Sequence, residues 1–255
     1  MPYLDRAGTN IYYEVTGATN RRPPLLLSHG FGASSAMWQP NRAALAAGRP
    51  VITWDMRGHG RSDSPADPAQ YSHRACVADM AALLDAAGAE RAVAGGLSLG
   101  GFLSLAFCLE IPDRVAALVL CDTGPGFRSD QARERWNSRA LATADRLERG
   151  GLEVLGEDSA PTAPRHRSAS GLARAARGML AQSSSEVIDG LASIRVPTLV
   201  LVGGRDEAFV GAAEYVAAKI PGARKVVIPD AGHMCNIDQP DLFNEAVRPF
   251  LAGLR

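Results

Sequence analysis

The clearest chemical signal in this chain is a serine between two glycines, in Gly96-Leu97-Ser98-Leu99-Gly100. A short, mostly apolar stretch of strand length precedes it at 91–95, and an apolar run without a helix breaker follows it at 102–109. Gly-x-Ser-x-Gly at a strand-to-helix turn is the nucleophile elbow, in which a tight turn exposes the serine hydroxyl. Side chains at the glycine positions would collide with neighbouring backbone. We therefore predict that Ser98 is a nucleophile.

A serine hydroxyl is a poor nucleophile until a base takes its proton, so a histidine and an orienting acid must come from elsewhere in the chain. Of the five histidines, His233 is the one that follows the serine in a loop after a predicted strand, at 225–229. Asp206 precedes it, after a strand pattern at 196–202 and a Gly-Gly turn. The sequence therefore predicts a triad in the order Ser98, Asp206, His233.

Five motifs, taken in order, resemble the α/β-hydrolase superfamily along nearly the whole chain. They are Ser28-His29-Gly30-Phe31-Gly32, residues 55–62, the elbow, Gly203-Gly204-Arg205-Asp206 and Gly232-His233. The nearest resemblance is to small esterases and lactonases of the 3-oxoadipate enol-lactonase kind, through residues 120–123 and 231–240. The resemblance implies that the backbone N–H groups of Phe31 and Leu99 form an oxyanion hole, which can stabilise a transition state by about 3 kcal/mol.

A second acid competes with Asp206. Asp122 follows a predicted strand at 115–121, and in some members of the superfamily the acid stands at this earlier position. We favour Asp206, because Gly203-Gly204 supplies a turn that would swing its side chain towards His233. Asp122 is well placed to cap or brace the segment that follows it.

Several polar residues in glycine-rich turns are interpreted as structural. His29 follows a predicted strand, and we expect hydrogen bonds to hold it in its turn rather than leave it free as a base. His59 receives the same interpretation. Asp55 and Arg57 stand close together, and we expect a carboxylate and a guanidinium so placed to pair and fix their loop.

Strand and helix patterns alternate along the chain, which predicts an α/β fold: a doubly wound, mostly parallel sheet of about eight strands. An edge hairpin at 3–6 and 11–15 precedes the other strands, which are expected at 24–28, 51–55, 92–97, 115–121, 197–202 and 225–228. Helices are expected at 41–47, 72–87, 102–109, 213–220 and 241–251. Active sites of such sheets lie outside the carboxyl ends of the strands, where the three triad residues fall.

The alternation breaks after residue 123 for about 70 residues, which is long for a plain loop and predicts an inserted unit. We therefore expect an α/β-hydrolase core at 1–123 and 190–255, with a small helical cap at 124–189. Substrate-pocket candidates are Trp136, Ala140, Met179 and Met234. Trp136 and Met179 have the alternative interpretation of cap core positions.

The amino-acid composition limits the kinds of binding partner that we expect. The 27 basic and 27 acidic residues give a formal net charge of zero, so no electrostatic footprint indicates nucleic acid or an anionic membrane. No apolar run approaches a membrane span and no secretory leader is evident, so we expect a cytoplasmic protein. Four widely spaced cysteines predict neither disulfides nor a zinc site. We expect no metal and no organic cofactor.

Together these features predict an enzyme: a serine hydrolase acting on small carboxylic esters or lactones through an acyl-enzyme. Three alternatives remain open, because fold does not determine function. The same scaffold serves carbon-carbon bond hydrolases and cofactor-free perhydrolases. Some hydrolase-like proteins are ligand receptors that keep the triad and turn over slowly.

Overall fold

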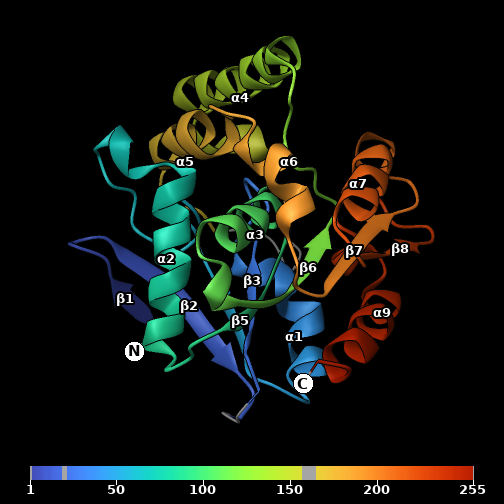
Figure 1. The fold of residues 1–255 in the computed structure, drawn as a ribbon. Coiled ribbons are helices and arrows are strands. Elements are labelled where there is room, and N and C mark those ends of the chain that lie inside the picture. The colour runs from blue at the N-terminus through green and yellow to red at the C-terminus, as the bar shows by residue number, and fades with distance from the viewer. Residues whose placement is uncertain (1, 19–21, 157–164, 255) are drawn as a thin grey trace.

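The architecture is built on a central sheet in a computed structural model that describes residues 2–18, 22–156 and 165–254. The strands within this part of the chain are β1 (Tyr3–Asp5), β2 (Asn10–Thr16), β3 (Leu25–Ser28), β4 (Val51–Trp54), β5 (Ala92–Leu97), β6 (Val115–Cys121), β7 (Thr198–Gly203) and β8 (Arg224–Ile228). They form one sheet in the order β1-β2-β4-β3-β5-β6-β7-β8 (Figure 1). β1 and β2 pair antiparallel, as do β2 and β4, and the strands from β4 to β8 run parallel. The predicted fold class and its edge hairpin are confirmed.

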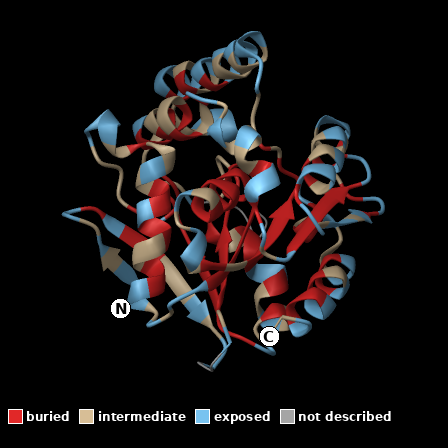
Figure 2. Ribbon diagram, viewed as in Figure 1, coloured by how far each residue is buried: buried red, intermediate tan, exposed pale blue. Residues whose placement is uncertain are grey.

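The central parallel strands are apolar throughout because helices cover both faces of the sheet. Consecutive residues of β3 point to opposite faces, so Leu25 and Leu26 belong to different core clusters. The Leu26 cluster includes side chains of α2 (His73–Ala86), α3 (Leu99–Glu110) and α7 (Glu207–Lys219). The Leu25 cluster includes side chains of α1 (Gln39–Leu45) and α9 (Pro240–Ala252). Figure 2 shows the buried sheet between these layers.

Two helices begin directly after candidate catalytic residues. α3 starts at Leu99, immediately after Ser98, and α7 starts at Glu207, immediately after Asp206. The sequence placed the start of the second helix at 213. The structure begins it earlier, because the carbonyl of Asp206 accepts hydrogen bonds from the N–H groups of the first turn. Both residues therefore stand where a strand has ended and a helix begins.

A helical insert separates β6 from β7. It contains α4 (Asp130–Gly150), α5 (Ala169–Ala175) and α6 (Glu186–Gly190), and α4 and α5 lie above one end of the sheet (Figure 1). The Ser129 hydroxyl accepts from the Ala132 N–H at 3.4 Å, as expected of a helix cap. Alanine and leucine side chains of α4, α5 and the helical turn that follows α5 form a separate small core: Ala144, Leu147, Leu172, Ala173 and Ala176. Residues 157–164 of the predicted cap lie outside the described residues.

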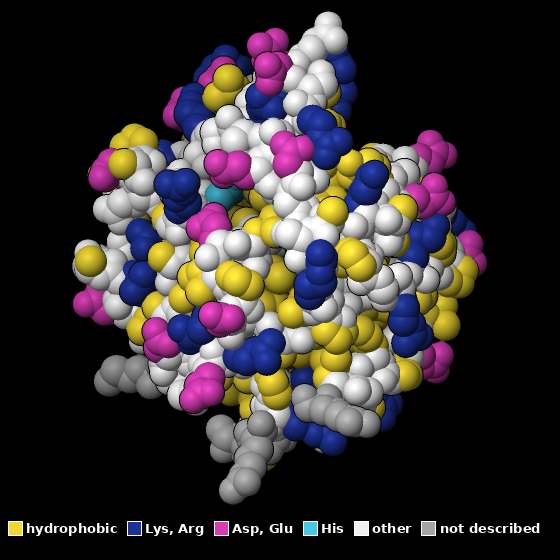
Figure 3. Space-filling model, viewed as in Figure 1, with side chains coloured by type: hydrophobic (Ala, Val, Ile, Leu, Met, Phe, Trp, Pro, Cys, Tyr) yellow, Lys and Arg dark blue, Asp and Glu magenta, His cyan; other side chains and the backbone are white. Residues whose placement is uncertain are grey.

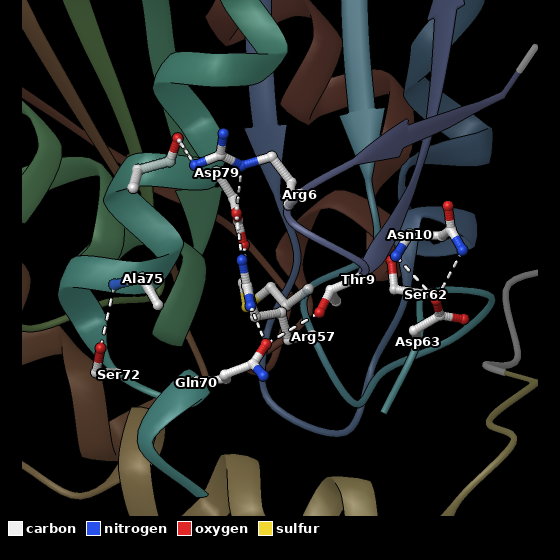
Figure 4. A network of polar contacts seen from close by, with 12 residues as sticks. Arg6, Thr9, Asn10, Arg57, Ser62, Asp63, Gln70, Ser72, Ala75 and Asp79 are labelled. Carbon is white, nitrogen blue, oxygen red and sulfur yellow. Dashed lines mark hydrogen bonds and ion pairs between the residues drawn. The ribbon is translucent and has the colours of Figure 1, made fainter. Parts of the chain in front are cut away.

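A polar network ties the N-terminal hairpin to α2 (Figure 4). Arg57 pairs with both carboxylate oxygens of the buried Asp79, at 2.6 and 2.8 Å, and Arg6 donates to the same carboxylate at 3.0 Å. The predicted pairing of Asp55 with Arg57 is therefore wrong. Asp55 instead accepts from backbone N–H groups, that of Ser35 among them at 2.6 Å. Asp79 prevails because it offers the planar guanidinium a bidentate partner.

The surface carries both signs of charge. Basic and acidic side chains are interspersed over the face in Figure 3, as the zero net charge of the sequence suggests. Within the described residues, none of the helices combines the length and the apolar character needed to cross a membrane.

Candidate active site

Ser98 lies in a strained turn between β5 and α3. Its φ of 53° and ψ of −114° fall outside the regions that L-residues normally adopt, at a cost on the order of 1–3 kcal/mol. A Cβ atom on Gly96 would lie 2.4 Å from the carbonyl carbon of Gly100, and one on Gly100 would lie 2.2 Å from the carbonyl oxygen of Ser28. The turn therefore requires glycine at both positions, as the elbow motif predicts.

The backbone of Ser98 is held from two elements. Its N–H donates to the carbonyl of Cys121 at 2.9 Å. Its carbonyl accepts from the Phe102 N–H at 3.0 Å and from the Thr123 hydroxyl at 2.6 Å. These contacts keep the strained conformation in place, and the partly exposed Ser98 side chain lines a cavity.

Asp206 and His233 form a hydrogen-bonded pair. The distance from His233 Nδ1 to Asp206 Oδ2 is 2.8 Å, with the acid 6% and the histidine 41% exposed. A carboxylate accepts there from Nδ1–H, which leaves Nε2 unprotonated in the neutral ring. The ring of Phe209 packs on that of His233, with centroids 4.8 Å apart. Phe209 lines the same cavity as Ser98, so the ring that packs on His233 also borders that cavity.

The loops that carry the acid and the base are packed backbone to backbone. The N–H of Gly204 donates to the carbonyl of Ile228, and that of Arg205 to the carbonyl of Ala231, both at 2.8 Å. A Cβ atom on Gly203 would lie 2.1 Å from the carbonyl oxygen of Gly232. Glycine at 203 is therefore required by the close approach of the histidine loop.

The turn after β3 holds the first predicted oxyanion donor. The carbonyl of Gly30 accepts from the Ala33 N–H at 3.1 Å, and Gly32 has a φ of 72°, which favours glycine. Within the described part of the chain, no acceptor is found for the N–H of Phe31 or of Leu99. Both groups are thus available to another acceptor.

His29 is a structural residue of this turn, as predicted. It is fully buried, its Nδ1 lies 2.7 Å from the Gly30 carbonyl oxygen, and its Nε2 accepts from the Met56 N–H at 3.0 Å. Burial lowers the pKa of His29 to about 4. His59 packs beside it at 4.9 Å between ring centroids, and burial lowers its pKa as well. Neutral imidazoles therefore support the turn.

His166 joins the helical insert to this turn, a contact that sequence reasoning missed. Its Nδ1 accepts from the Gly60 N–H at 3.0 Å, so its Nε2–H donates to the Gly32 carbonyl at 2.9 Å. Burial lowers the pKa of His166, which keeps this arrangement neutral. No local pattern around residue 166 signals the contact, because its partners are 106 and 134 residues away.

A cavity of about 230 Å³ lies between the insert and the ends of the strands. It is mostly apolar, and Arg139 is its lining residue with a permanent charge. Other lining residues come from α2, α3, the loop after β6, the insert and α7, and they include His73, Ser98, Phe102, Phe127, Trp136, Met179 and Phe209. Such a volume suits a substrate of modest size.

Two of the four pocket candidates line this cavity. Trp136 and Met179 are lining residues, and the Trp136 indole N–H donates to the Leu180 carbonyl at 2.8 Å. Ala140 and Met234 are not among them. Ala140 is buried in the insert, and Met234 is 44% exposed. The helical period around Trp136 suggested a shared face, but Trp136 lines the cavity and Ala140 does not.

The comparison with known proteins places this geometry in a family. A model described as the alpha/beta hydrolase family matches residues 25–246. The chain belongs to the alpha/beta hydrolase family. The predicted superfamily is thereby confirmed, and the match spans every strand from β3 to β8.

Relatives within the alpha/beta hydrolase family carry different activities. A Bacillus subtilis protein named as a putative 2-succinyl-6-hydroxy-2,4-cyclohexadiene-1-carboxylate synthase is 30% identical, over 92% of this chain and 92% of its own. The enol-lactonase of Burkholderia xenovorans LB400 is 29% identical with a TM-score of 0.79, covering 98% of this chain and 100% of its own. A thermophilic esterase of Thermogutta terrifontis, solved with malate bound, is 32% identical with a TM-score of 0.79, covering 99% and 97%.

Residues 2–18, 22–156 and 165–254 contain no group of three or more His, Cys, Asp or Glu side chains arranged to hold a metal ion. The four cysteines are free and buried.

Neither Phe209 nor His166 was identified from the sequence as a residue of the site. The position of Phe209 three residues after Asp206, at the start of a helix, is the signal that identifies it in retrospect.

Proposed function

We propose that this protein is a serine hydrolase that cleaves small carboxylic esters or lactones through an acyl-enzyme. The observation that carries the proposal is the 2.8 Å contact of His233 with Asp206, beside Phe209, which lines the same cavity as Ser98. The relatives named as an esterase and an enol-lactonase are consistent with it. The relative named as a synthase is the reason to test other bond types as well.

In the proposed reaction, Ser98 Oγ attacks the carbonyl carbon while its proton passes to His233 Nε2. Asp206 holds the ring through Nδ1–H and stabilises the imidazolium. The N–H groups of Phe31 and Leu99 donate to the developing oxyanion, where each donor can be worth about 3 kcal/mol.

The collapse of the tetrahedral intermediate releases the alcohol, which takes the proton from the His233 imidazolium. Water then attacks the acyl-enzyme with the neutral histidine as its base, and the carboxylic acid leaves Ser98 free. These steps use the chain's own residues and water.

Covalent labelling tests the nucleophile. A fluorophosphonate probe should label the wild-type protein and leave Ser98→Ala unlabelled, because the probe reacts with an activated serine. Ser104→Ala is a matched control, because Ser104 is buried in α3, the helix that begins after Ser98, and its hydroxyl donates to the Gly100 carbonyl at 2.8 Å. The probe should label Ser104→Ala as it labels the wild-type protein. Labelling that persists in Ser98→Ala would overturn the assignment.

A substrate panel tests the reaction class. It should contain p-nitrophenyl esters of increasing acyl length, small lactones, acyl-homoserine lactones and a half-ester of a dicarboxylic acid, since Arg139 lines the cavity. Steady multiple turnover of an ester or lactone is the expected result, with the best substrates among the shorter acyl chains. Single turnover with retained product would indicate a receptor, and turnover of a carbon-carbon substrate alone would reject ester hydrolysis.

A further inference from the structure

Asp122 is a buried acid that the proposed reaction does not use. It stands directly after β6, beside β7 in the sheet (Figure 1), and it is 0% exposed. Its φ of 43° lies in the left-handed region, which aspartate tolerates better than most residues with a side chain. A carboxylate buried at the ends of the strands beside the candidate triad is a candidate for a functional role.

The Asp122 carboxylate touches both loops that bear the Asp206–His233 pair. Oδ1 accepts from the Gly203 N–H at 2.7 Å, three residues before Asp206. Oδ2 lies 3.4 Å from the Cys235 N–H, two residues after His233. The Cys235 thiol is a further hydrogen-bonding partner of the same carboxylate.

Among the described residues, and apart from the Asp206–His233 bond itself, the other hydrogen bonds between these two loops reach residues that precede His233. The main-chain bonds from Gly204 and Arg205 reach Ile228 and Ala231, which both precede His233. Asp122 is the contact that reaches past the histidine, at Cys235. The Asp122 carboxylate therefore connects the acid loop, at Gly203, to the chain that follows His233, at Cys235.

We propose that Asp122 is a positioning residue, which holds the loops of Asp206 and His233 at the separation that their hydrogen bond requires. This inference rests on the proposed function for its kinetic part. A positive His233 would favour the ionised form of Asp122, since the two side chains interact electrostatically. Burial raises the pKa of Asp122 to about 6, while hydrogen bonds from Cys235 and Gly203 oppose this shift. The carboxylate is therefore ionised at pH 8, where the test is made.

Kinetics of Asp122→Asn at pH 8 test the proposal. The amide keeps an acceptor for the Gly203 N–H but loses the charge and turns a donor towards Cys235. We expect kcat to fall about tenfold with KM unchanged, and Asp122→Ala to fall about a hundredfold. Asp238→Asn is the matched control, because Asp238 accepts from the Gly232 N–H at 2.8 Å within the histidine loop alone. Its kcat should stay within threefold of wild type, and an Asp122→Asn kcat within the same limit would overturn the proposal.

A double variant separates positioning from a general structural effect. If Asp122 acts through the Asp206–His233 pair, Asp122→Asn should cost little once Asp206→Asn is present, because residues that act as a unit are not additive. Losses that multiply would overturn the proposal. Should Asp122→Asn fail to fold, Asp122→Ser, which keeps one hydroxyl oxygen, is measured against the same thresholds.

Proton NMR supplies a readout that needs no substrate. The hydrogen-bonded Nδ1 proton of His233 should give a downfield resonance in protein labelled with 15N-histidine, absent in Asp206→Asn. In Asp122→Asn we expect this resonance to shift or broaden, and in Asp238→Asn to stay unchanged. An unchanged resonance in Asp122→Asn overturns the inference. If Asp122→Asn changes this resonance but the wild-type protein hydrolyses no ester and is not labelled by the probe, the proposed function fails while the positioning role stands.

Discussion

Replacing Asp206 by asparagine is the sharpest test of the candidate triad. The amide has the shape of the carboxylate but can present an N–H₂ group to His233 Nδ1, 2.8 Å away. Nδ1 must then accept, the ring proton moves to Nε2, and the base can no longer take a proton from Ser98. The wrong tautomer can lower kcat by about 10⁴, which corresponds to about 5 kcal/mol.

The smallest effect compatible with this reasoning follows from charge alone. If the amide turns its oxygen to Nδ1–H, the tautomer survives and only the ion pair with the imidazolium is lost. With His233 41% exposed, unit charges about 4 Å apart interact by about 1–4 kcal/mol, depending on the effective dielectric constant. That range equals a loss of about fivefold to a thousandfold. We expect the tautomer effect to dominate and kcat to fall by about 10⁴.

Stability should change little in the same variant. His233 is partly exposed and the amide keeps a hydrogen-bonding group for its ring, so the change should be about 1 kcal/mol or less, and Tm should shift by no more than about 2–4 °C. The assay is kcat with a p-nitrophenyl ester, beside circular dichroism and thermal unfolding. Asp230→Asn is the matched control: Asp230 lies in the histidine loop, is 70% exposed and pairs with Arg205, and its loss should leave kcat unchanged. A kcat for Asp206→Asn within threefold of wild type, in a folded protein, would refute this assignment.

Three further predictions concern stability. Gly100→Ala should lower the free energy of unfolding by more than about 4 kcal/mol, because its Cβ would lie 2.2 Å from the Ser28 carbonyl oxygen. Gly211→Ala should instead raise the free energy of unfolding by about 0.5–1 kcal/mol, because residue 211 is helical and has open space around it. Urea unfolding measures both changes. Burial lowers the pKa of His166, so the wild-type protein keeps its stability above pH 6.5 and loses stability as the pH drops below that value. In His166→Gln the loss should be shallower by up to about 1.4 kcal/mol per pH unit. Equal slopes in the two proteins would contradict a buried, neutral His166. The pKa of Asp122 is raised to about 6, so its charge costs up to about 3 kcal/mol at pH 8; Asp122→Asn should gain stability relative to wild type at pH 8, and this advantage should shrink as the pH falls through 6.

The sequence by itself determined the features that rest on local pattern. The strand-to-helix turn at Ser98 could be predicted, because apolar runs with the strand and helix periods flank a motif whose glycines have a steric reason. The strands from β3 to β7 were readable because burial on both faces makes them largely apolar. The order of Ser98, Asp206 and His233 followed from the strand ends that precede them.

Only the tertiary structure decided which distant side chains meet. Asp206 and Asp122 both end parallel strands at the same edge of the sheet, and the sequence offered a turn as the sole reason to prefer one. In the structure Asp206 contacts His233, while Asp122 contacts the backbone on either side of that pair.

The cavity and the ion pairs show the same limit. Arg57 pairs with Asp79 and not with Asp55, which is closer in the sequence. His166 forms a hydrogen bond with Gly32, which is 134 residues away in the sequence. Ala140 shares the helical period of Trp136 but does not line the cavity that Trp136 lines. Periodicity specifies which residues share one side of an element, whereas the partner of that side depends on how the elements pack, and packing is set by the whole chain at once.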